Sequence, residues 1–310
     1  MISTQLQEIY YMGFLQEELR SYILETVEIQ RAKTIKNNQK IFNYALEDEM
    51  PVWIWKEKTE SGRWILKYYS EAEKIYLPES CDEMFDEMPN LERIDFTGID
   101  SSLTKNMYSM FGRCENLREI DLSGFDFSNV VNMGRMFSGC KKLKEIKFPK
   151  SCYQKLKDTS SMFANCKKLQ NIDISNLDTR NVIKMDCMFE GCRKLRDVDL
   201  MNLEVKNVIS MKRLFAYCSN LESVKFPKSK TPNLEDMSWM FSHCKSLKKV
   251  DLSNFDISNV KKADGMFDNC INLEEAIFPE DNTFEKCENI RLFKDCNKLS
   301  SVENLGLEYM

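Results

Sequence analysis

A period of 26 residues constrains this chain more than any other feature. A Met-Phe or Leu-Phe pair recurs without a single insertion. From the second unit onward, a cysteine follows each phenylalanine by three positions and a leucine follows each cysteine by three. Self-similarity at a fixed period of this length is the signature of a solenoid, in which each unit buries its apolar stripe against the next. The pairs begin at Met84, Met110, Met136, Met162, Met188, Leu214, Met240, Met266 and Leu292.

Each unit predicts one strand and one return segment. Leu117, Ile120 and Leu122 illustrate an alternation that is typical of a short strand with one buried face. The apolar residues that follow have the spacing of an amphipathic helical turn or short helix. They are Val130, Met133, Met136 and Phe137. We therefore predict an α/β fold, a leucine-rich-repeat-like solenoid of about nine coils with parallel strands about 4.8 Å apart.

The two ends of the repeat array predict covering structures. Residues 52–69 read as two alternating strands around Ser61 and Gly62, which predicts a β-hairpin cap rich in tryptophan. At the other end, residues 302–307 resemble a degenerate last coil, with Asn304 at an apolar strand position. A stack of coils needs such covers because its first and last apolar faces have no neighbouring coil.

The segment before the hairpin predicts two helices. Residues 3–48 carry apolar side chains at helical spacing, and the polar stretch 33–39 divides them. These helices either fold back on the cap or form an arm for a dimer or a partner. The apolar positions are Leu6, Ile9, Tyr10, Tyr22, Ile23 and Val27. The predicted domains are a helical segment at 1–48, the hairpin cap at 49–70 and the solenoid at 71–310.

Charge and hydropathy limit the classes of partner. The net charge is -5 and the pI is near 5.3, which argues against nucleic acid because duplex binders usually carry a basic face. No apolar run approaches the roughly 20 residues that cross a bilayer. The first basic residue is Arg20 and no signal peptide is visible, so the sequence predicts a cytoplasmic protein unless a leader was removed.

Two units carry a specific resemblance to a known family. They are CENLREIDLSGFDFSNVVNMGRMFSGC, from Cys114 to Cys140, and CKSLKKVDLSNFDISNVKKADGMFDNC, from Cys244 to Cys270. Over about residues 68–305 the chain resembles the BspA-type leucine-rich-repeat family. The resemblance implies a surface protein, mostly bacterial, that attaches to host or matrix proteins and has no catalytic residues to transfer. Members usually carry a leader or an anchor, and neither is visible here.

The cysteine column predicts packing in the core. Zinc sites need closely spaced cysteine pairs, and no Cys-x-x-Cys occurs. Cysteines on adjacent coils point the same way, so we expect free, buried thiols in a reducing or anaerobic setting. His243 and Cys244 are an alternative as a nucleophilic dyad, although sequence neighbours rarely meet its geometry. Without other chemical motifs, we predict neither enzyme activity nor a cofactor.

The outward residues of the predicted strands are candidates for binding. Six of these nine residues are acidic, and Lys147 and Lys225 each fall between two aspartates. We interpret them either as a solvated face or as an acidic strip on the concave sheet for a basic segment of a partner, with calcium a weaker alternative. They are Asp95, Asp121, Lys147, Asp173, Asp199, Lys225, Asp251, Ile277 and Glu303.

Three aromatic residues occur where sister coils have small or polar side chains. Tyr108, Tyr217 and Trp239 are not demanded by the repeat, so they are candidate anchors of an interface or pack partially on neighbouring coils. Together these patterns predict a non-catalytic protein-binding scaffold, in adhesion or host interaction. The alternative is an intracellular sensor or regulatory protein that acts through its N-terminal helices.

Overall fold

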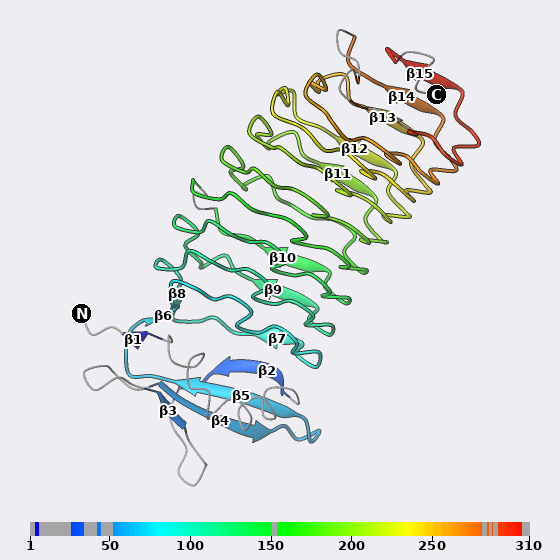
Figure 1. Ribbon diagram of the computed structural model, residues 1–310. Helices are drawn as coiled ribbons and strands as arrows, with labels where there is room; N and C mark the ends of the chain where they lie inside the picture. The colour runs from blue at the N-terminus through cyan, green and yellow to red at the C-terminus, as the bar shows by residue number, and fades with distance from the viewer. Residues whose placement is uncertain are drawn as a thin grey trace.

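Stacked coils form an elongated body with a cap at one end (Figure 1). The computed structural model describes residues 4–5, 26–33, 42–44, 52–150, 154–280, 284, 287 and 291–305. A ladder of parallel bridges joins eight successive coils through one residue each, from Ser80 to Lys262. The fold is therefore a β-solenoid of about eight turns, slightly fewer than the nine expected from the Met-Phe and Leu-Phe pairs.

Short parallel strands line one face of the solenoid. They form three groups, β9 with β10, β11 with β12, and β13 with β14 and β15, and each pairs in register, as Ile120 does with Ile146. Residues 171–173 form no strand, which leaves the gap between β10 and β11 in Figure 1. The strands of this face are β7 (Arg93–Ile94), β9 (Glu119–Asp121), β10 (Glu145–Lys147), β11 (Asp197–Asp199), β12 (Ser223–Lys225), β13 (Lys249–Asp251), β14 (Glu275–Ile277) and β15 (Ser301–Glu303). β6 (Ile75–Tyr76) and β8 (Ile99–Asp100) pair with each other in a separate sheet on another side of the stack (Figure 1).

The return segments are tandem turns, so the short helices that the spacing allows there, and the α/β class that depends on them, are not supported by the described residues. No helix occurs among the residues that the structure describes. Ser109 and Arg113 have positive φ values of 49° and 56°, and equivalent residues do so along the solenoid. The Ser109 amide donates to Gly134 of the next coil (2.9 Å), while the Gly112 amide donates back to Ser109 (2.9 Å). Some main-chain amides thus donate to a carbonyl oxygen within the same turn and others to a carbonyl oxygen of the next coil. In a helix, each would donate to the carbonyl oxygen four residues earlier.

The core consists of continuous columns of side chains. Phe111, Phe137 and their equivalents stack face to face, with ring centroids 5.4 Å apart for this pair. The stack extends from Phe85 to Phe293. Most of these rings are fully buried, so each phenylalanine contributes apolar burial and a ring-stacking geometry that fixes the register of adjacent coils. The predicted register of the repeats is confirmed.

The cysteine column lies beside the phenylalanines, and its thiols are free and, except for the half-buried Cys296, buried, as predicted. Each thiol also has a specific partner: Cys140 Sγ donates to the Phe111 carbonyl oxygen at 3.1 Å, and the same oxygen accepts the Cys114 amide at 3.3 Å. The same bond recurs at Cys166 and Cys244. The cysteines therefore do more than fill space, because they satisfy main-chain carbonyls that face the core.

The hairpin predicted around Ser61 and Gly62 is confirmed. It consists of β4 (Val52–Lys58) and β5 (Trp64–Tyr69), which pair antiparallel. The Tyr68 hydroxyl donates to the Asp95 carbonyl oxygen at 2.8 Å, which ties the hairpin to the first coil. The domain boundaries at residues 48 and 70 stay a prediction.

The described part of residues 1–48 forms strands, so helices are not supported there. It consists of β1 (Thr4–Gln5), β2 (Thr26–Arg31) and β3 (Phe42–Tyr44). β2 lies parallel between β5 and β7 in a sheet of order β3-β4-β5-β2-β7, so this stretch folds back on the cap. The expected helical positions Leu6, Ile9, Tyr10, Tyr22 and Ile23 lie outside the described residues.

The last coil agrees with its prediction in part. Val302 lies in β15, and the side chain of Asn304 donates to the Phe278 carbonyl oxygen at 3.0 Å. Residues 306 and 307 lie outside the described part. Among the residues that the structure describes, no helix is long and apolar enough to cross a membrane.

Candidate functional site

The outward residues of the strands, here called the strand face, lie where the sequence places them. Ile120 is buried between exposed Glu119 and Asp121, and Val198 and Val250 are flanked in the same way. Most of the predicted residues are exposed, and Asp95 and Ile277 are half-buried. The exposed members are Asp121, Lys147, Asp173, Asp199, Lys225, Asp251 and Glu303.

The strand-face aspartates have a structural task that the sequence analysis missed. Asp121 Oδ1 accepts the Ser123 amide at 3.0 Å and the Ser123 hydroxyl at 2.5 Å. Asp173 accepts the same two groups from Ser175. Asp95, Asp199 and Asp251 each accept the amide two residues on. Such bonds close the turn after each strand, which explains why aspartate recurs at this position.

The charges of the strand face are partly neutralised along the stack. Lys147 lies 3.3 Å from Asp121, and Lys225 lies 3.8 Å from Asp199. Hydrogen bonds from Ser123, with Lys147 a smaller influence, lower the pKa of Asp121. These exposed pairs stabilise the fold little. The strip is thus a mixed-charge surface more than a uniformly acidic one.

Two hollows open on the strand face near the cap. One, of about 270 Å³, is lined by Arg93, Asp121 and Lys147 among others. The other, of about 280 Å³, includes Arg31 and Asp95 in its lining. Arg93 and Ile94 of β7 line both, so the structure brings three predicted site residues, Asp95, Asp121 and Lys147, around one arginine. The remaining predicted strand residues lie farther along the stack.

The three candidate aromatic residues each pack on the following coil. A Cβ atom at Gly134 would lie 3.2 Å from the Tyr108 ring, and one at Gly265 would lie 2.6 Å from the Trp239 ring. Tyr217 places its ring 4.5 Å from that of His243 and remains 43% exposed. Tyr217 and Trp239 both have positive φ, so their side chains project from turns. They do not join the strand-face hollows, and a role as anchors stays a prediction.

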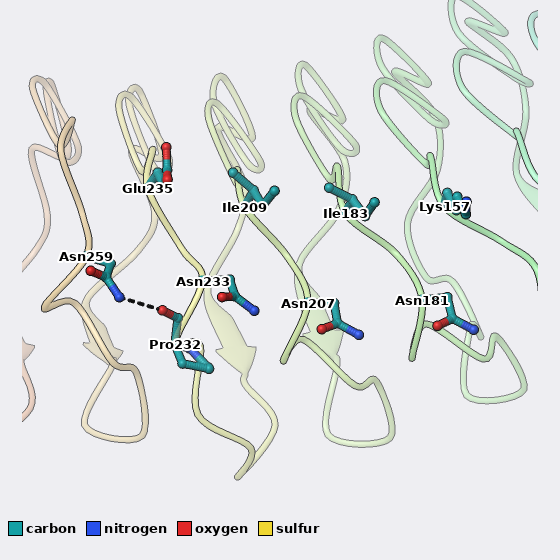
Figure 2. A pocket seen from close by; sticks show the side chains of 9 residues that line it. All are labelled: Lys157, Asn181, Ile183, Asn207, Ile209, Pro232, Asn233, Glu235 and Asn259. Carbon is teal, nitrogen blue, oxygen red and sulfur yellow. Dashed lines mark hydrogen bonds between the residues drawn. The ribbon is translucent and has the colours of Figure 1, made fainter.

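A groove on another face is lined by two side-chain columns (Figure 2). Its volume is about 540 Å³. In one column the asparagine amides donate to carbonyl oxygens of the preceding coil, for example Asn207 to Arg180 at 2.7 Å and Asn259 to Pro232 at 2.8 Å. In the other, Ile209 is 41% exposed. The asparagines recur every 26 residues at 181, 207, 233 and 259, a signal that the sequence analysis did not use.

The groove offers a surface for contact, but its lining places no two charged side chains close to each other. Lys157 and Glu235 are its charged lining residues, and they lie three coils apart, about 14 Å at the usual strand spacing. Ile183 and Ile209 occupy the coils between them. Among the residues that the structure describes, no group of three or more His, Cys, Asp or Glu is placed to hold a metal ion.

The His243–Cys244 pair is not arranged as a dyad. Cys244 Sγ donates to the Phe215 carbonyl oxygen at 3.1 Å, and burial raises the pKa of this thiol well above its usual range. His243 Nδ1 instead lies 2.8 Å from the Ser242 hydroxyl. The thiol therefore remains protonated at neutral pH, and its hydrogen-bond partner is a main-chain oxygen.

Comparison with known proteins identifies the repeat. No curated protein matches the sequence. A crystal structure of a leucine-rich repeat protein from Bacteroides ovatus ATCC 8483 is similar, with a TM-score of 0.41 and 14% identity, over 89% of this chain and 77% of that one. The family described as "Mycoplasma protein of unknown function, DUF285" matches residues 79–198, 145–249 and 197–304, which is consistent with the BspA-type resemblance. Since these matches cover well over half of its length, the chain belongs to this DUF285 repeat family.

Proposed function

We propose that this protein is a non-catalytic scaffold that binds a protein partner through the capped end of its strand face. One observation carries the proposal: two adjacent hollows meet at Arg93 and Ile94, next to charged residues of three other strands. Arginine beside an apolar side chain in a concave surface is a frequent centre of binding energy in interfaces. The arginine is accessible, because its side chain is 66% exposed in its 3.3 Å pair with Glu119.

A rigid support favours this surface over the rest of the molecule. β7 pairs with β2, which pairs in turn with the long hairpin strand β5, so the hollows sit on the broadest sheet. Preorganised surfaces bind more tightly because less conformational freedom is lost on association. The surface is of mixed charge, and we propose that it takes a partner surface of mixed charge more readily than a uniformly basic segment.

We propose no catalytic role for the His243–Cys244 pair. The thiol of Cys244 is protonated and bonded to a carbonyl, and the lone histidine contacts Ser242 and Tyr217. An enzyme would need an activated nucleophile or a general base within hydrogen-bond reach of a substrate. Turnover that disappears in His243→Ala or Cys244→Ala would contradict the proposal.

The BspA-type resemblance supports a host or matrix protein as the partner. Antibodies that label intact producing cells would support this location, whereas detection only after lysis would favour the intracellular alternative. That alternative relied on a free N-terminal arm. In the structure, β2 is paired on both sides, so this strand is part of the cap sheet and offers no open strand edge.

Cross-linking pull-down tests the strand-face proposal. The variant Arg93→Ala, Asp121→Asn, Lys147→Gln removes three charges while asparagine retains the Oδ1 acceptor that closes the turn at Ser123. We expect the variant to lose partners that the wild type enriches, by about tenfold for a central hot spot. Lys245→Gln, Lys248→Gln and Lys261→Gln together form a control of the same size on distant coils. Equal capture by wild type and strand-face variant would reject the surface.

A further inference from the structure

A dense basic cluster interrupts this acidic chain. Three consecutive coils read CKKLK from Cys140, CKKLQ from Cys166 and CRKLR from Cys192. Eight of the nine positions around the leucines in segments 141–144, 167–170 and 193–196 are Lys or Arg, and these eight side chains are here called the basic block. The sister segments on either side read ENLR from Glu115 and SNLE from Ser219. The repeat itself therefore does not require the basic residues.

The structure places these segments side by side. The Lys144 amide donates to the Arg118 carbonyl oxygen at 2.8 Å, and the Glu222 amide donates to that of Arg196 at 2.8 Å, which fixes the outer coils of the block in the stack. Between them, Phe137, Phe163 and Phe189 stack in sequence. Six of the eight side chains are exposed, and Lys141 and Lys167 are half-buried.

Most of this positive charge has no salt-bridge partner in the described part of the chain. Lys141 pairs with Glu115 at 2.5 Å, and Arg196 lies 3.9 Å from Glu222. The other six side chains form no salt bridge with any residue that the structure describes. Cations on coils about 4.8 Å apart repel one another within the Debye length of about 8 Å. This repulsion lowers the stability of the fold. A ligand that supplies negative charge would explain why the basic side chains are placed together.

The surroundings of the block favour a narrow ligand. Glu115 and Glu222 border it along the stack, and exposed Glu145 and Asp197 border it toward the strand face. A duplex or a membrane surface extends its negative charge over these acidic neighbours and is repelled by them. The block also contains no aromatic side chain on which unpaired bases could stack. A single peptide segment can keep its carboxylates over the block.

We propose that the basic block docks an acidic peptide segment of the partner protein, one rich in Asp or Glu. This rests on the proposed protein-binding function and adds a second contact to it. In an extended segment, alternate side chains lie about 6.8 Å apart. Carboxylates at this spacing reach lysines on successive coils, and their attraction speeds association and weakens with salt.

Binding of a fluorescein-labelled octaglutamate peptide to the full chain tests the proposal. The variant Lys168→Gln, Lys194→Gln removes two exposed charges of the block, and Lys245→Gln, Lys248→Gln is the control with the same charge change. We expect the block variant to bind at least about tenfold more weakly than the wild type and the control to bind within about twofold. Equal binding by wild type and block variant, or no binding by the wild type, would overturn the proposal.

Competition identifies the class of ligand. Unlabelled octaglutamate is expected to displace the probe at lower charge concentration than a DNA duplex or phosphatidylserine vesicles, and stronger displacement by either would overturn the peptide assignment. The melting temperature of the block variant is expected to equal or exceed that of the wild type, because repulsion is relieved. If the peptide binds through the block while the pull-down enriches no partner, the proposed function fails and the block remains an anion-binding surface. If strand-face variants alone lose the partner and the peptide does not bind, only the block proposal fails.

Discussion

At the scale of single residues, the cysteines link packing to chemistry. Their regular spacing predicts a buried column, and the structure confirms it. Their partners could not be predicted, because the orientation of each carbonyl depends on the left-handed residues of the turns. Burial raises the pKa of Cys114 to about 12 and raises those of Cys140, Cys166 and Cys218 well above the usual range of a thiol.

These shifts predict a protein that loses stability in alkali. A thiol whose pKa is raised by folding stabilises the folded state fully below its unfolded pKa, near 8.5, and loses this contribution as the pH rises toward the folded value. Each buried thiol then lowers the free energy of unfolding by up to about 1.4 kcal/mol per pH unit. We expect urea midpoints to fall steeply above about pH 9.

A variant separates the thiols from other alkaline titrations. Cys140→Ala, Cys166→Ala lowers stability at neutral pH because it leaves small cavities. Its loss of stability between neutral pH and alkali is nevertheless expected to be shallower than that of the wild type. A parallel pH profile for the two proteins would show that these thiols do not carry the effect.

At the scale of elements, the turns after the strands depend on aspartate. The Asp173 carboxylate accepts the amide and the hydroxyl of Ser175 at 3.0 and 2.6 Å. We expect Asp173→Ala to lower the free energy of unfolding by about 1 kcal/mol, since these bonds are lost. Asp173→Asn retains an acceptor oxygen, so we expect it to lower the free energy of unfolding by less than about 0.5 kcal/mol. Equal urea midpoints for the two variants would show that the hydrogen bonds from Ser175 to the Asp173 side chain do not stabilise the fold.

The return segment shows where prediction from periodicity ends. Val130, Met133 and Met136 have the spacing of a helix, and all three are buried as that pattern requires. Consecutive turns with a left-handed residue at every fourth position give the same spacing. Arg135 occupies one such position with a φ of 56°, although arginine gives no sign of it in the sequence. Main-chain bonds to the next coil decide the outcome, and apolar spacing does not report them.

At the scale of the whole molecule, the constant period predicts that one coil can be removed. Deleting residues 219–244 joins Cys218 to Lys245 and brings Phe215 next to Phe267 in the stack, since the equivalents of one coil are lost together. We expect the shortened protein to unfold in one cooperative transition, because every column remains in register. Deleting 219–243 instead shifts the columns by one residue. A shortened protein as unstable as this control would contradict the prediction.

The architecture beyond the repeats was only partly predictable. The hairpin was predictable, because Ser61 and Gly62 separate two segments in which apolar and polar residues alternate. The cap sheet was not predictable, because β2 pairs with β5 and β7, which lie about 40 and 65 residues away along the chain. The strand-face hollows arise from the same long-range pairing. Local patterns identify the coils, and only the assembled end creates the candidate site.

The unequal continuity of the two sides has a mechanical consequence. On the turn side, hydrogen-bonded bridges run without a break from Ser80 to Lys262, whereas on the strand side pairing stops between β7 and β9, at residues 171–173 and between β12 and β13. A stack that is bonded continuously along one side and interrupted three times along the other bends more easily toward and away from the interrupted side. We expect the turn side to keep a constant length while the molecule bends at the three interruptions of the strand side, so that it can follow a curved partner.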